Sequence, residues 1–234
     1  MKKFAILFDL DGTLVDTEIL HAEAESKVLG DLGIHISPEE ITRTYAGIPT
    51  ESYIRELGDQ KESTEDLMIK KRRILEALVR QVCIRPVPGM PGLISYLKNL
   101  EVPMFVVSSS DRTWIRKCLA TTFVVDHEEH SYRDYFGENF ISGSEVANPK
   151  PAPDVFMEAK RLMLGTNESL KSEDVEWIVV GDGLADMVGA RSANMKALIL
   201  GVLQDKPIDD KKTMFFSSST ELMTYIKNMF QATK

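Results

Sequence analysis

Cysteine and histidine are scarce in this sequence, and their scarcity excludes several classes of protein. The 234 residues include 2 cysteines and 4 histidines. Cys83 and Cys118 lie too far apart for the closely spaced ligand pairs of a structural zinc site, and two cysteines do not make a disulfide scaffold. We expect both to be small, buried, apolar residues of a protein in a reducing compartment.

The sequence also lacks an excess of basic residues and any long apolar run. Its 28 Lys and Arg residues stand against 36 Asp and Glu residues, giving a formal net charge of -8 that argues against a nucleic-acid partner. The run from Phe4 to Phe8 is too short for a signal peptide. No run approaches the roughly 20 apolar residues of a membrane span. We therefore expect a cytoplasmic protein with no membrane partner.

What the sequence does contain is a series of short apolar runs typical of buried parallel strands. The strong runs are Phe4 to Phe8, Val102 to Val107, Trp177 to Val180 and Ala197 to Leu200, and weaker ones are Phe140 to Ile141 and Met214 to Phe216. The first three strong runs are each followed by a turn and a helical stretch. This alternation predicts an α/β fold with a doubly wound, parallel-sheet (Rossmann-like) core.

Residues 17–85 interrupt this alternation and are helical in pattern. Ser37 is a suitable N-cap, with Pro38 at the first helical position and Glu40 placed to complete a capping box. Apolar residues from Leu67 to Val82 recur at helical spacing, which predicts one long amphipathic helix. We predict an all-helical cap domain over residues 17–85, inserted into an α/β catalytic core formed by residues 1–16 and 86–234.

Polar residues follow the predicted strands, where the ends of neighbouring parallel strands meet and where sites of such sheets lie. They are Asp9 and Asp11 after the first strand, Ser108 to Ser110 after the second, Lys150 in a later loop, and Asp182 and Asp186 after the third. Taken singly, each is typical of a turn, a helix cap or a solvated surface. Together they provide two carboxylates for attack and proton transfer, oxygen ligands for Mg²⁺, and a lysine and a hydroxyl that neutralise phosphoryl oxygens.

These residues resemble the motifs of the haloacid dehalogenase-like hydrolase superfamily. Asp9-Leu10-Asp11-Gly12-Thr13 is similar to the first motif, Ser108 to the second, and Gly181-Asp182-Gly183-Leu184-Ala185-Asp186 to the fourth. Lys150-Pro151-Ala152-Pro153-Asp154 resembles the third motif in the form common to the helical-cap subgroup. That subgroup contains phosphatases and β-phosphoglucomutase. The resemblance spans nearly the whole chain.

The resemblance implies a covalent mechanism centred on the first motif. Asp9 would attack phosphorus and form an aspartyl-phosphate. Asp11 would protonate the leaving oxygen and then activate water as a general base. Ser108 would donate a hydrogen bond to a phosphate oxygen, with the backbone amide of Ser109 nearby.

The resemblance also implies the charged surroundings of the phosphoryl group. Lys150 would pair with Asp9 and with the bound phosphate. Mg²⁺ would be held by Asp9, Asp182 and the backbone carbonyl of Asp11. Asp186 would lie beside these ligands and orient water or Lys150.

We expect a phosphatase for a small phosphorylated metabolite, such as a sugar, polyol or nucleotide-like phosphate, in a monomer or weak homodimer. A phosphosugar mutase is the alternative. It is disfavoured because Thr50 and Gly181 stand where the mutase has an arginine and a glutamate. A phosphoacceptor signalling module is a further alternative, although its phosphorylated aspartate normally lies on a later strand and it has no inserted cap. A binding protein without catalysis would lack the nucleophile or the acid, and both are present.

Overall fold

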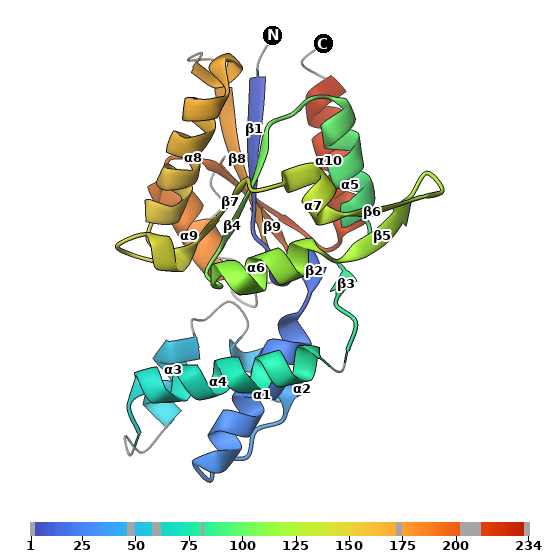
Figure 1. Cartoon of the computed structure of the whole chain (residues 1–234). Coiled ribbons are helices and arrows are strands. Elements are labelled where there is room, and N and C mark those ends of the chain that lie inside the picture. The colour runs from blue at the N-terminus through green and yellow to red at the C-terminus, as the bar shows by residue number, and fades with distance from the viewer. Residues whose placement is uncertain are drawn as a thin grey trace. The chain divides into compact units, whose positions relative to one another are not determined.

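The computed structural model divides the chain into two compact units. One unit comprises Met1–Val15 with Pro86–Lys234, and the other Asp16–Arg85. The structure describes residues 3–45, 50–57, 62–80, 82–171, 175–201 and 212–231. Figure 1 shows that the first unit combines strands and helices and that the second is built of helices.

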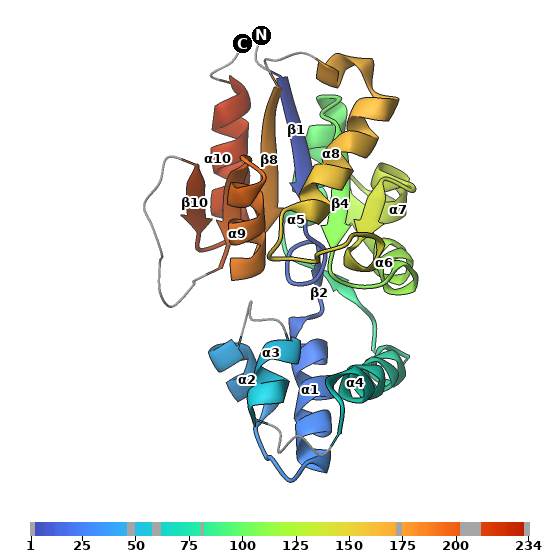
Figure 2. The ribbon, with the colours of Figure 1, turned by 90° about the vertical axis from the view of Figure 1, so that its left-hand side faces the viewer.

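The first unit contains a parallel sheet of six strands in the order β10-β9-β8-β1-β4-β7. These are β1 Lys3–Phe8, β4 Met104–Ser108, β7 Phe140–Ser142, β8 Val175–Gly181, β9 Lys196–Leu200 and β10 Thr213–Phe216. β1 lies between β8 and β4, as Figure 2 shows, and Phe8 pairs with Val180 on one side and Val106 on the other. The four strong and two weak apolar runs of the sequence supply these six strands.

Helices cover both faces of the sheet. α8 (Asp154–Thr166) and α9 (Leu184–Ser192) lie on one side of it, and α5 (Met90–Asn99) and α10 (Ser219–Gln231) lie on the other (Figure 1). Ala5 and Leu7 pack in one cluster with residues of α8 and α9, so the alternate residues of β1 point to the opposite face. This arrangement confirms the predicted doubly wound α/β core.

Shorter elements complete this unit. They are α6 Arg112–Leu119, α7 Tyr132–Phe136, the 3₁₀ helices η1 Gly143–Glu145 and η2 Glu168–Lys171, and a hairpin of β5 Thr122–Val125 and β6 Glu128–Ser131. Two-residue strands β2 (Val15–Asp16) and β3 (Arg85–Pro86) pair with each other. No described helix combines the length and the apolar character that spanning a membrane requires.

The longer elements described in the second unit are all helices. It contains α1 Glu18–Asp31, α2 Pro38–Tyr45, α3 Thr50–Leu57 and α4 Thr64–Val79. The hydroxyl of Ser37 accepts a hydrogen bond from the amide of Glu40 at 3.2 Å, as expected for an N-cap. Apolar residues of all four helices, including Val28, Ile41, Ile54 and Leu67, form its core.

Two expectations about the end of this unit are wrong. α4 ends at Val79, so the predicted apolar stripe does not continue to Val82, which is 45% exposed. Cys83 is also exposed, whereas Cys118 is buried as predicted. Val82 and Cys83 both lie beyond the last turn of α4, so the helix does not direct their side chains toward the core.

Candidate active site

The strand order β8-β1-β4 brings three predicted site residues to one edge of the sheet. Asp9 directly follows β1, Asp182 directly follows β8, and Ser108 is the last residue of β4. The amide of Asp9 still donates to the carbonyl of Val180 at 2.8 Å, so the ladder holds the backbone of Asp9 in place. The carboxyl ends of these parallel strands therefore form the floor of the site.

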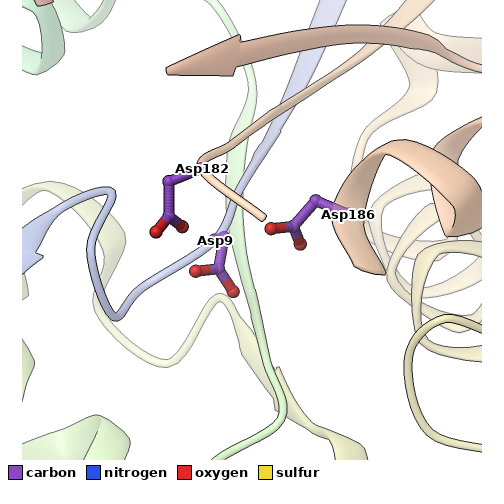
Figure 3. A group of neighbouring side chains, drawn as sticks. All are labelled: Asp9, Asp182 and Asp186. Atoms are coloured by element: carbon purple, nitrogen blue, oxygen red, sulfur yellow. The ribbon is translucent and has the colours of Figure 1, made fainter. Parts of the chain in front are cut away.

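Three carboxylates converge at this edge. Asp9, Asp182 and Asp186 each offer an oxygen, and these oxygens lie within 4.8 Å of one another. Figure 3 shows the three carboxyl groups as neighbours, with Asp186 reaching toward the other two from α9. Asp186 comes from the first turn of α9, where its carboxylate also accepts the amide of Gly183 at 3.3 Å. A set of carboxylate oxygens is the donor chemistry that Mg²⁺ prefers.

Lys150 joins two of these carboxylates. Its Nζ donates to Oδ1 of Asp9 at 2.5 Å, to Oδ1 of Asp186 at 2.7 Å and to the carbonyl of Val107 at 2.9 Å. The lysine is 8% exposed, and each of its three donors therefore has an acceptor in the protein. Lys150 thus ties the loop before α8 to the ends of β1 and β4.

Negative charge is concentrated at this edge. The ammonium group of Lys150 contacts the carboxylates of Asp9 and Asp186, and the carboxylate of Asp182 lies beside them. Burial, and then the negative charge of Asp186, raise the pKa of Asp9 to about 7, against the opposing effect of Lys150. Burial alone would lower the pKa of Lys150, but Asp186 and Asp9 outweigh burial and raise it. A divalent cation would offset the negative charge that these three carboxylates bring together, so the residues fit a bound Mg²⁺.

Asp11 is held by both of its carboxylate oxygens. The indole Nε1 of Trp114 donates to Oδ1 at 2.8 Å, and the hydroxyl of Ser110 donates to Oδ2 at 2.9 Å. Asp11 lies in a tight loop in which the amide of Gly12 donates to the carbonyl of Val15 at 2.8 Å. The negative charge of Asp11 contributes to the raised pKa of Asp9, which places the two carboxylates in one electrostatic environment.

Ser108, at the end of β4, and Ser109, in the loop that follows, differ in exposure. Ser108 is buried, and its hydroxyl oxygen accepts the amide of Ser110 at 3.0 Å. Ser109 is exposed. The hydroxyl of Ser142, at the end of β7, donates to the carbonyl of Ser110 at 2.7 Å and secures this loop.

Three further side chains, to which the sequence motifs assign no role, contact the predicted site residues. Trp114 and Ser110 bind Asp11, and the hydroxyl of Thr13 donates to Oδ1 of Asp182 at 3.0 Å. Thr13 lies within the first motif, so the sequence pattern could have indicated that it contacts the site. For Trp114 the signal was weaker: it lies in the first turn of the helix that follows β4, close to that strand's carboxyl end.

Comparison with known proteins shows similarity to hydrolases over most of the chain. A profile of haloacid dehalogenase-like hydrolases matches residues 6–200. The chain is 25% identical to a phosphorylated carbohydrates phosphatase of Thermotoga maritima, over 94% of this chain and 93% of that protein. It is 22% identical to the 6-phosphogluconate phosphatase of Escherichia coli, over 93% and 92%. A haloacid dehalogenase-like hydrolase from Entamoeba histolytica superposes with a TM-score of 0.73 at 21% identity, over 97% and 100% of the two chains, and shares the fold.

Proposed function

The chain belongs to the haloacid dehalogenase-like hydrolase family, and we propose that it is a magnesium-dependent phosphatase of a small phosphorylated metabolite. The substrate class is a sugar, polyol or nucleotide-like phosphate monoester. One observation carries the proposal: Asp9 lies at a strand end with Lys150 on one of its oxygens and Asp182 and Asp186 beside it. That arrangement surrounds a carboxylate nucleophile with the charges that phosphoryl transfer needs.

The reaction proceeds in two displacements at phosphorus. A carboxylate oxygen of Asp9 forms a bond to phosphorus, and the bond to the leaving oxygen breaks as Asp11 donates a proton to that oxygen. Asp11, now ionised, takes a proton from a water molecule. The water oxygen attacks the aspartyl-phosphate, releases inorganic phosphate and restores Asp9.

The remaining residues stabilise charge on the phosphoryl group. Lys150 and the hydroxyl of Ser108, with the amide of Ser109, would bind its oxygens. Asp9, Asp182 and the backbone carbonyl of Asp11 would hold Mg²⁺, which when bound neutralises negative charge on the substrate. Asp186 would keep Lys150 in position through its 2.7 Å contact.

The packing around Gly181 supports a phosphatase over the mutase alternative. A Cβ atom built on Gly181 would lie 2.5 Å from Cγ of Asp186 and 2.6 Å from its Cβ. A glutamate at this position, which the mutase alternative requires, would therefore displace Asp186. Lys150 would then lose one of its carboxylate partners. In the helical unit, the hydroxyl of Thr50 donates to Glu25 at 2.7 Å, where the mutase reading requires an arginine.

The test is a phosphate-release screen over a panel of phosphorylated sugars, polyols and nucleotides, with MgCl₂ and with EDTA. We expect at least one substrate to be hydrolysed with MgCl₂ and not with EDTA, and Asp9→Asn to lose activity by at least a thousandfold. Asp126→Asn is the matched control. Asp126 lies in the turn of the β5–β6 hairpin with φ 52°, a conformation that asparagine tolerates, so its activity should be unchanged. Full activity in Asp9→Asn would remove Asp9 from its role.

The same screen separates hydrolysis from the mutase alternative. Conversion of β-glucose 1-phosphate to the 6-phosphate without release of free phosphate would contradict the phosphatase assignment.

A further inference from the structure

We propose that Trp114 is a positioning residue for Asp11: its indole N–H fixes the carboxylate so that one defined oxygen, Oδ2, exchanges the proton with the leaving group. The inference rests on the proposed function, because it assigns Asp11 as the general acid. It concerns a residue outside the motifs that the sequence analysis identified.

The structure holds Trp114 firmly from both its backbone and its ring. Trp114 occupies the third position of α6, and its amide donates to the side chain of the N-cap Asp111 at 3.0 Å. The residue is 7% exposed, so the ring is packed and has little freedom to rotate. Cys118, one turn further along the same face of α6, is fully buried. The indole N–H therefore meets Asp11 at a fixed place.

Two donors from one segment bind the two oxygens of Asp11. Trp114 donates to Oδ1 at 2.8 Å and Ser110 donates to Oδ2 at 2.9 Å. A carboxylate with a single hydrogen bond can turn about its Cβ–Cγ bond, whereas donors on opposite oxygens fix its plane. The terminal torsion of an aspartate side chain has a broad energy minimum, so the carboxylate turns easily unless hydrogen bonds restrain it.

The two donors differ in whether they can also accept a hydrogen bond. An indole nitrogen donates and cannot accept, whereas a serine hydroxyl does both. When Asp11 carries its proton, the indole N–H continues to bind the oxygen that has the carbonyl character, which is Oδ1. The proton then lies on Oδ2, where the hydroxyl of Ser110 can reverse its role and accept it until the leaving oxygen arrives. Trp114 thus selects which oxygen of Asp11 acts as the acid.

The test compares two aryl phosphates that differ in leaving group. Phenyl phosphate needs protonation of its leaving oxygen more than p-nitrophenyl phosphate does, and kcat/KM covers the steps up to departure of that group. Trp114→Phe keeps the apolar ring and removes the N–H. We expect kcat/KM to fall by about tenfold or more for phenyl phosphate and by less than about threefold for p-nitrophenyl phosphate, since losing one hydrogen bond to a charged group weakens only the step in which Asp11 acts.

Trp177→Phe is the matched control. Trp177 is the other tryptophan of the chain and lies buried on β8, so the same substitution should leave the ratio of the two rates unchanged. Equal losses on the two substrates in Trp114→Phe would show that the ring only packs against the site. A gain in activity would show that Trp114 holds Asp11 away from its working position. Either result overturns the proposal.

Two further measurements test the proposal if Trp114→Phe does not fold or if neither aryl phosphate is hydrolysed. If circular dichroism shows that Trp114→Phe does not fold, Ser110→Ala is used instead, because it removes the other donor to Asp11. It should also lower the rate on phenyl phosphate more than the rate on p-nitrophenyl phosphate. Equal losses would again contradict the proposal. In Trp177→Phe the one remaining indole N–H resonance belongs to Trp114, and Asp11→Ala should shift it upfield. That spectrum tests the contact even if neither aryl phosphate is hydrolysed, so a failure of the proposed function is distinguishable from a failure of this inference.

Discussion

Gly12 lies against the carboxylate of Asp182. A Cβ atom on Gly12 would stand 2.2 Å from Oδ2 and 2.8 Å from Cγ of Asp182, and the φ angle of Gly12 is +78°. Two independent requirements therefore fix glycine at this position: the left-handed backbone conformation of the loop and the close approach of a proposed metal ligand. Thr13 donates to the other oxygen of the same carboxylate, so the loop after β1 positions Asp182 from both oxygens.

Gly12→Ala should lower activity by more than tenfold, because the added methyl group displaces Asp182 from the carboxylate cluster. It should also reduce the free energy of unfolding by about 1–2 kcal/mol through the left-handed conformation alone. Steady-state rates and urea unfolding measure the two effects separately.

Gly33→Ala is the matched control for that experiment. Gly33 has φ +81°, but nothing lies within 4 Å of the Cβ that would be added. This variant should show a similar loss of stability and no loss of activity. Equal losses of activity in the two variants would mean that backbone strain, and not contact with Asp182, explains the effect.

The sheet and much of the candidate site can be predicted from the sequence for a simple reason. Parallel strands buried on both faces require continuous apolar runs, and their carboxyl ends meet at one edge. Polar residues directly after such runs, such as Asp9 and Asp182, must therefore lie close together once the strands pair. Lys150 lies in a loop without periodicity, so its position came from motif resemblance and not from strand geometry.

Other features depend on contacts that no local pattern records. The β5–β6 hairpin was not predicted because its turn is formed by Asp126 and His127, with φ 52° and 70°, and not by the glycine or asparagine that usually marks such a turn. The contact between Trp114 and Asp11 joins residues 103 positions apart, and it depends on the phase of a short helix and on one side-chain rotamer.

Replacing Lys150 should affect both catalysis and stability. Lys150→Met leaves Asp9 and Asp186 without their buried cationic partner, and breaking a buried pair in this way costs about 3–5 kcal/mol. Activity should fall by at least a thousandfold, since the phosphoryl oxygens also lose a positive charge. Lys171→Met is the control, because Lys171 pairs with Glu168 at an exposed site where an ion pair contributes about 1 kcal/mol or less. A Lys150→Met protein as stable as the control would contradict this account.

The helical unit has an acid-sensitive ion pair. Nζ of Lys71 lies 2.6 Å from Oε1 of Glu25, and the Thr50 hydroxyl donates to the same oxygen. Burial alone would raise the pKa of Glu25, but the charge and hydrogen bond of Lys71 outweigh burial and lower it below 4.5. A depressed pKa means that the stabilisation is present above the pKa of the unfolded chain and is lost as the pH falls through that of the folded protein.

Glu25→Gln should therefore be less stable than the unmodified protein at pH 7, by about 2 kcal/mol. The difference should shrink as the pH falls below about 4.5, because the unmodified protein then loses the same charge. Urea unfolding of both proteins between pH 3 and pH 7 measures this. A difference that stays constant or widens in acid would refute the assignment of the ion pair as the source of stability.

Magnesium should stabilise the protein through the carboxylate cluster. Burial, and then the negative charge of Asp186, raise the pKa of Asp9, so a cation that binds there stabilises its ionised form in the folded state and has no such site in the unfolded chain. We expect saturating MgCl₂ to raise the melting temperature by several degrees. Asp182→Asn should abolish most of that rise, because it removes one proposed ligand, whereas Asp126→Asn should keep it. If Asp182→Asn retains the full rise, the ion binds elsewhere and the proposed metal site at the ends of β1 and β8 is wrong.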